Sequence, residues 1–124
     1  MKLGPPESEQ PLTDDTVVIR LGLMRLQDLK ASSQRSRTSQ GFHALSFYGE
    51  NGLAHDEVAA LAEKPHPQMR RSRVGILRQA GFEIQRSGRF PHLTIVFGAE
   101  PTEEQLERLL AAFDEAEPNP HPVQ

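Results

Sequence analysis

The sequence contains no cysteine and no tryptophan, and its only tyrosine is Tyr48. Without cysteine the chain can form no disulfide, thiolate nucleophile or cysteine-ligated zinc site, and this composition is compatible with a reducing compartment. No apolar run approaches the roughly 20 residues that a membrane helix needs, and residues 1–7 lack the apolar stretch of a secretory signal. We therefore expect a soluble cytoplasmic protein that does not insert into a membrane.

Glycine-rich phosphate loops are also absent, because each glycine stands singly between other residues. The histidines show no paired spacing on one helix, and no cysteine supplements them as metal ligands. They are His43, His55, His66, His92 and His121. The sequence therefore predicts no metal site.

A chain of 124 residues fits a single domain. Both ends are rich in proline, as in the segment EPNPHPVQ at 117–124. Alternating prolines remove backbone donors and block helices and central strands. We expect a disordered N-terminal tail over 1–14, one domain over 15–116 and a proline-rich C-terminal tail over 117–124.

Basic residues are concentrated in the middle of the chain. The net charge is −3, yet 12 of the 14 lysines and arginines lie within residues 20–90, and both flanks are acidic. A basic centre favours an anionic partner, because arginine forms bidentate contacts with phosphate. The alternative is that the acidic flanks offset the centre and keep the protein soluble.

The first half of the chain alternates between strand and helix patterns. Apolar residues alternate over 17–23 and predict a strand. A short helix over 24–34 is expected to fade into a mobile polar loop that reaches residue 41. The segment GFHALSFYG at 41–49 predicts a second strand, and apolar spacing predicts a helix over about 54–63.

The second half begins with a helix that Ser72 is expected to cap and that Gly81 ends in a left-handed conformation. A hairpin follows, with its turn at Ser87-Gly88. Thr102 then caps a final amphipathic helix. The order β-α-β-α-α-β-β-α predicts an α+β fold, in which helices pack on one face of a four-stranded, mostly antiparallel sheet to give two layers.

The returning strand of the hairpin carries the segment RFPHLTIVFG. We expect its apolar residues Leu93, Ile95 and Phe97 to face the helices, which leaves His92 and Thr94 on the opposite face. There the imidazole can transfer a proton while the hydroxyl donates to a phosphoryl oxygen. The alternative is that these are two polar residues on an ordinary exposed strand face.

This His-Leu-Thr segment resembles the His-x-Thr motif of the two-histidine phosphoesterases, which cleave cyclic or RNA-derived phosphodiesters. That family uses two such motifs that face each other. The other candidate here is the segment from His43 to Ser46, whose hydroxyl comes three residues after the histidine. That spacing places the two side chains on opposite faces of a strand, unless a bulge intervenes.

A second resemblance is to the small ADP-ribosyltransferase-like folds. In those folds an arginine on the first strand contacts the NAD phosphates, and a hydroxyl residue on a later strand supports the ribose. The resemblance implies these roles for Arg20 and Ser46, with Glu83 as the only strand candidate for the acidic residue. NAD would then be the cofactor, and otherwise we expect none. The alternative is that Arg20 is an ordinary surface or ion-paired residue.

Six arginines in the second half are candidates for a phosphate-binding patch, with nucleic acid as a possible partner. They are Arg70, Arg71, Arg73, Arg78, Arg86 and Arg89. The aromatic platform on which bases stack is not evident, because the chain has one tyrosine and no tryptophan. Solvated charge is the alternative explanation.

Taken whole, residues 17–120 resemble small proteins of high-GC actinobacteria that share the RVGxLRxAGF helix end and the Pro-His-x-Thr strand. That resemblance implies one compact domain and no particular activity. The leading hypothesis is a small cytoplasmic binding domain with an accessory, mobile-element or toxin–antitoxin role, which captures an anionic or protein partner through its basic middle section. An NAD-using toxin and a two-histidine-type phosphoesterase are the alternatives.

Overall fold

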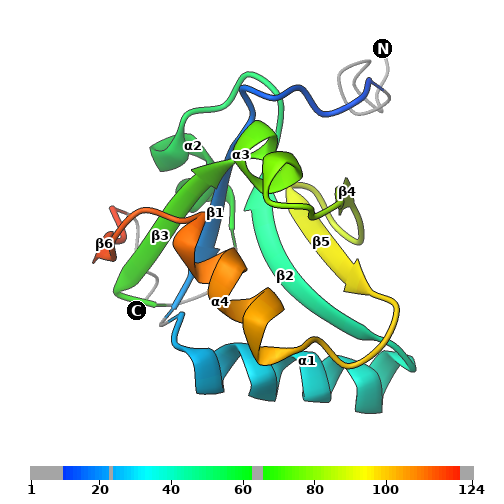
Figure 1. Cartoon of the computed structure of the whole chain (residues 1–124). Helices are drawn as coiled ribbons and strands as arrows, with labels where there is room; N and C mark the ends of the chain where they lie inside the picture. The colour runs from blue at the N-terminus through cyan, green and yellow to red at the C-terminus, as the bar shows by residue number, and fades with distance from the viewer. Residues whose placement is uncertain (1–9, 23, 63–65, 121–124) are drawn as a thin grey trace.

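The computed structural model describes residues 10–22, 24–62 and 66–120. Within these residues the strands are β1 (Val17–Leu21), β2 (His43–Gly49), β3 (Gln68–Arg73), β4 (Ile84–Arg86), β5 (His92–Phe97) and β6 (Glu117–Pro118). The helices are α1 (Leu26–Gln40), α2 (His55–Leu61), α3 (Val74–Gln79) and α4 (Glu103–Ala111). All neighbouring strands pair antiparallel in the order β4-β5-β2-β1-β3-β6 (Figure 1). The predicted α+β class is confirmed, but the sheet has six strands and not four.

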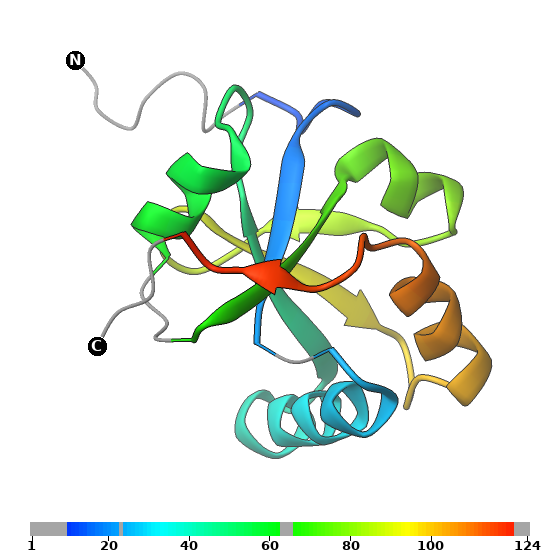
Figure 2. The same ribbon diagram turned by 90° about the vertical axis from the view of Figure 1, so that its left-hand side faces the viewer.

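The helices lie on both faces of the sheet, because β1 is apolar on both faces. Val18 belongs to a large core that includes Leu77 of α3 and Leu106 of α4. Its neighbour Ile19 points the other way and packs with Val58 of α2. Figure 2 shows α2 on the opposite side of the sheet from α3 and α4. The prediction that all helices pack on one face was therefore wrong.

The strand β3 has no counterpart in the sequence-based order, because only Met69 of its six residues is apolar. Its arginines are accommodated by specific partners. Arg71 Nε lies 2.9 Å from the Glu117 carboxylate, and Arg70 Nε donates to the Asp114 carbonyl at 2.6 Å. A strand that is held by polar contacts of this kind carries no period-two apolar signal.

Ser72 lies within β3 and does not cap a helix. Its hydroxyl donates to the Ala112 carbonyl at 2.7 Å, and α3 begins at Val74. The end of α3 matches the expectation: Gly81 has φ +95°, and the Phe82 amide donates to the Leu77 carbonyl at 2.9 Å.

The described part of the expected C-terminal tail, 117–120, is attached to the sheet. Glu117 and Pro118 form β6 beside β3, and the buried Asn119 donates its backbone amide to the Pro67 carbonyl at 2.8 Å. Residues 121–124 lie outside the described residues. A proline can occupy an edge strand such as β6, because that position needs no donor toward solvent.

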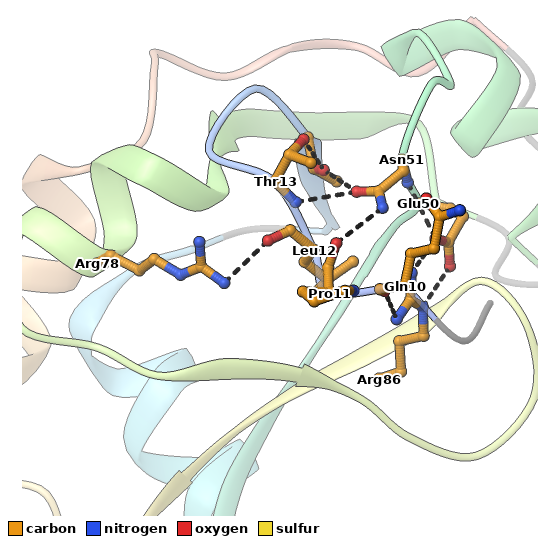
Figure 3. A network of polar contacts seen from close by, with 9 residues as sticks. Gln10, Pro11, Leu12, Thr13, Glu50, Asn51, Arg78 and Arg86 are labelled. Carbon is orange, nitrogen blue, oxygen red and sulfur yellow. Dashed lines mark hydrogen bonds and ion pairs between the residues drawn. The ribbon is translucent and has the colours of Figure 1, made fainter. Parts of the chain in front are cut away.

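The N-terminal segment from residue 10 is also attached to the domain, and residues 1–9 lie outside the described residues. Leu12 is buried in the larger core, and its carbonyl accepts from Arg78 Nη2 at 3.0 Å. Asn51 Nδ2 donates to the Pro11 carbonyl at 3.0 Å, as Figure 3 shows. Side chains from α3 and from the end of β2 thus fix a segment that was expected to be a tail.

The polar loop that was expected to follow the short helix is itself helical, since α1 continues to Gln40. The helix ends where Gly41 takes φ +92° and its amide donates to the Arg37 carbonyl at 3.0 Å. The buried Ser33 shares a 2.9 Å hydrogen bond with His43 Nδ1. The second half of α1 is therefore held by polar contacts, and it lacks the apolar stripe on which a helix prediction depends.

The inside–outside phase of β5 is as predicted. Leu93, Ile95 and Phe97 are buried in the larger core, and Val96 is exposed on the opposite face. The final helix is also as expected, because the Thr102 hydroxyl accepts from the Gln105 amide at 3.1 Å and forms a capping box. On the opposite face of β5 His92 is half-buried and Thr94 is buried, so the two residues are covered in part and do not lie on a fully exposed strand face.

Candidate functional site

A cleft of about 520 Å³ lies between α1 and the polar face of β2 and β5. The sheet contributes Ser46, Tyr48, His92 and Thr94 to its lining. The helix contributes a polar face, β1 contributes Arg20, and His66 stands at the start of the segment that leads into β3. This volume lies within the range of roughly 300–1,000 Å³ that is typical of small-molecule sites.

The register between β2 and β5 explains why the four sheet residues meet. Ser46 pairs with Thr94, and Tyr48 pairs with His92. Successive side chains of a strand point to opposite faces, so two pairs that are two residues apart share one face. The Tyr48 and His92 rings are in edge-to-face contact with their centroids 5.6 Å apart.

Arg20 ties three elements together at one end of the cleft. Its Nη1 donates to the Ser46 carbonyl at 2.7 Å, and its Nη2 donates to the Ser32 hydroxyl at 3.0 Å. The guanidinium carbon lies 5.6 Å from the centre of the buried Phe47 ring. These contacts position the charge between β1, β2 and α1.

Arg20 forms no ion pair with a carboxylate among the described residues, and Asp28 acts on its charge only through a longer-range electrostatic interaction. Its side chain is half-buried, and its Nε is buried without a hydrogen-bond partner. Burial, and next to it the like charge of Arg35, lower the pKa of Arg20, although a guanidinium stays protonated in proteins. Among the described residues, the one carboxylate that lines the cleft is that of Asp28, which accepts from Arg25 Nε at 2.8 Å. The cleft therefore carries an excess of positive charge.

A serine of the β4–β5 turn holds the histidine and the threonine of β5. Ser87 Oγ lies 2.9 Å from His92 Nδ1 and also hydrogen-bonds the Thr94 hydroxyl. The Ser87 carbonyl lies 3.2 Å from the same ring nitrogen. The orientation of the imidazole is thus fixed by the turn, in the way that a partner on one ring nitrogen fixes a histidine.

The structure brings together four of the five predicted catalytic residues, because Arg20, Ser46, His92 and Thr94 all line the cleft. Glu83 does not line it and borders a separate hollow beside α4. The arrangement that the NAD interpretation needs, with Glu83 beside Arg20 and Ser46, is therefore not formed.

None of the six arginines that were expected to bind ligand lines the cleft. Five of them contact other parts of the chain: Arg70 the Asp114 carbonyl, Arg71 the Glu117 carboxylate, Arg73 the Asp15 carbonyl, Arg78 the Asp14 carboxylate, and Arg86 the Glu50 carboxylate. Arg89 borders a smaller hollow next to the cleft. Most of this basic section therefore contributes to the fold.

Several lining residues were missed from sequence, namely Ser32, Arg35, Ser36, Tyr48 and His66, together with Ser87 behind the sheet residues. The helical ones did leave a signal. Arg35, Ser36 and Ser39 come three, four and seven residues after Ser32, which places all four on one face of a helix. A polar stripe of this kind is easily taken for a loop when no apolar stripe accompanies it.

Within the described part of the chain, no group of three or more histidines and acidic residues is placed to hold a metal ion. No helix there is long and apolar enough to cross a membrane. The fold and the cleft define a small α+β domain with a polar, positively charged site of ligand size. No family model, curated protein or solved structure matches the chain.

Proposed function

We propose that this domain binds a small phosphorylated ligand in the cleft between α1 and the β2–β5 face. The observation that carries the proposal is the half-buried charge of Arg20, which forms no ion pair with a carboxylate among the described residues. Withdrawing a charge from solvent without an ion-pair partner is costly, and a phosphate would offset that cost through charge-assisted hydrogen bonds. A cytoplasmic location would supply such ligands.

The rest of the lining is also suited to an anion. Arg35 and His66 add donors, and the hydroxyls of Ser36 and Ser46 can donate to phosphate oxygens. The proposed ligand is thus anionic, as the basic composition favours. It would bind in the cleft beside α1 and not at the six arginines of the second half.

Replacing Arg20 with glutamine is expected to weaken the binding of inorganic pyrophosphate at least about tenfold, because a hydrogen bond to a charged group contributes roughly 1.5–3 kcal/mol. Isothermal titration calorimetry at low salt measures the change, and the affinity of the unaltered protein should fall as salt is added. Arg20 also has structural contacts, so Arg35→Gln serves as a second variant and should weaken binding too.

Arg37→Gln is the matched control, because Arg37 lies on the same helix and is exposed outside the cleft. Its affinity for pyrophosphate should equal that of the unaltered protein. The proposal would be refuted if the unaltered protein does not bind pyrophosphate. It would also be refuted if the Arg20 and Arg35 variants bind pyrophosphate as tightly as the unaltered protein does.

A second candidate function is cleavage of a phosphodiester, and the shared cleft favours it. An anion held at Arg20 would lie in the same hollow as His92 and Thr94. The second His-x-Thr motif of the two-histidine phosphoesterases has no equivalent on β2, because Ser46 and Tyr48 stand opposite the His-Leu-Thr segment. His92 would then transfer the proton, and His66 is a further imidazole in the lining of the cleft. The transferase alternative has less support, since Glu83 borders a different hollow.

Thr94→Val is expected to slow the hydrolysis of a 2′,3′-cyclic nucleotide about a hundredfold, because it removes a hydroxyl that can stabilise charge on the phosphoryl group. Chromatographic separation of the product measures the rate. Thr38→Val, on the exposed part of α1, is the control. No cleavage by the unaltered protein, or an unchanged rate in the Thr94 variant, would eliminate this second candidate.

A further inference from the structure

A second hollow of about 290 Å³ adjoins the cleft, and its lining is less polar. It lies between the end of α2 and the turn that connects β4 to β5, and its lining includes Leu61, Phe90 and Pro91 together with Arg89. Tyr48 and His92 line both hollows. The cationic cleft and the less polar hollow therefore meet at this pair of rings.

Two of the large apolar side chains that remain exposed border this second hollow. Phe90 is 53% exposed and Leu61 is 45% exposed, although nearly thirty residues separate them in the sequence. An accessible phenylalanine offers a flat face on which a planar ring can stack. Exposed apolar residues that gather beside a polar cleft mark a site for a ligand with one charged and one aromatic part.

We propose that the ligand is a nucleotide, with its phosphate against Arg20 and Arg35 in the cleft and its base against Phe90 in the adjoining hollow. The inference rests on the proposed function and adds the chemical class of the ligand. The positively charged cleft would bind the negative charge of the ligand, and the less polar hollow, with the exposed Phe90, would bind an uncharged planar group at the other end of the ligand. A simple phosphate or sugar phosphate would leave Phe90 and Leu61 exposed.

Calorimetric titration with AMP and with ribose 5-phosphate tests the inference, because the two probes share a phosphate and a ribose and differ in the base. We expect AMP to bind about tenfold more tightly, which is the order of effect that stacking of one base on an aromatic side chain produces. Phe90→Ala should remove this advantage and leave the affinity for ribose 5-phosphate unchanged.

Two further variants make the result specific. Phe42→Ala removes another exposed phenylalanine, 42% exposed, that lines neither hollow, and its AMP affinity should be unchanged. Phe90→Tyr keeps an aromatic face and should bind AMP like the unaltered protein. Its success would also show that a loss in Phe90→Ala reflects the missing ring and not a failure to fold.

The outcomes separate this inference from the proposal beneath it. Equal affinities for AMP and ribose 5-phosphate, or AMP binding that Phe90→Ala leaves unchanged, would overturn the nucleotide inference while phosphate binding stands. If AMP, ribose 5-phosphate and pyrophosphate all fail to bind, both are overturned.

Discussion

Replacing Phe47 with alanine is expected to lower the free energy of unfolding by about 3–5 kcal/mol, the usual cost of removing a buried aromatic side chain. Phe47 lies on the central strand β2 and is fully buried. Its ring stacks on Phe113 with centroids 5.6 Å apart and planes inclined by 17°. The guanidinium carbon of Arg20 also lies over this ring, 5.6 Å from its centre. The substitution therefore opens a cavity beneath the proposed ligand site.

Equilibrium unfolding in urea, followed by far-ultraviolet circular dichroism, measures the loss. Phe42→Ala is the matched control, because the exposed Phe42 precedes the same strand and its removal should change the free energy of unfolding by less than about 0.5 kcal/mol. A loss below about 1 kcal/mol for Phe47→Ala would mean that the ring does not pack as described.

The elements that could be predicted from sequence are those whose stability comes from a regular apolar pattern. The alternation in β5 correctly placed Leu93 and Ile95 in the core and left His92 on the other face. The stripe of α4, with Leu106 and Leu109 one turn apart, was equally clear. In such segments the local period and the tertiary environment impose the same structure.

The missed elements depend on single polar contacts between segments that are far apart in the sequence. The last part of α1 has the Ser33–His43 hydrogen bond, and β6 has the ion pair between Arg71 and Glu117. The local sequence around each of these residues does not indicate which distant residue it will contact. These segments therefore read as polar loop and tail, although the folded chain gives each a defined partner.

For the same reason, the residues of the candidate site could be predicted from the sequence, but their position in one shared cleft could not. Arg20, Ser46, His92 and Thr94 were each identified as polar residues on strands, yet in two separate hypotheses. The strand order β5-β2-β1, which no local pattern encodes, brings them into one cleft. The same order leaves Glu83 beyond reach, and α1 supplies the opposite wall.

The second large effect is expected at Glu50, which follows β2 and is almost fully buried, with 6% of its side chain exposed. Arg86 forms a bidentate ion pair with the Glu50 carboxylate: its Nε donates to Oε1 at 2.8 Å, and its Nη2 donates to Oε2 at 2.5 Å. Arg86 Nη1 also donates to the Gln10 carbonyl at 2.5 Å (Figure 3). This ion pair joins the end of β2 to β4 and to the N-terminal segment.

Glu50→Gln is expected to lower the free energy of unfolding by about 3 kcal/mol at neutral pH, because it leaves the charge of Arg86 partly buried without its counter-charge. Urea unfolding measures this loss. Glu103→Gln is the control. Glu103 forms a solvent-exposed ion pair with Lys30 at 3.0 Å, and loss of such a pair should lower the free energy of unfolding by less than about 1 kcal/mol.

The same pair predicts how stability depends on pH. Burial acts to raise the pKa of Glu50, but the hydrogen bonds from Arg86 and from the Asn51 amide outweigh it, so the pKa lies below its ordinary value. The stabilisation is therefore fully present above the unfolded-state pKa of about 4.3 and is lost as pH falls through the lower folded-state pKa. Urea unfolding of the unaltered protein at about pH 5 and pH 3 should show this loss, and Glu50→Gln should show a smaller one. Equal losses in the two proteins would mean that other carboxylates govern acid unfolding.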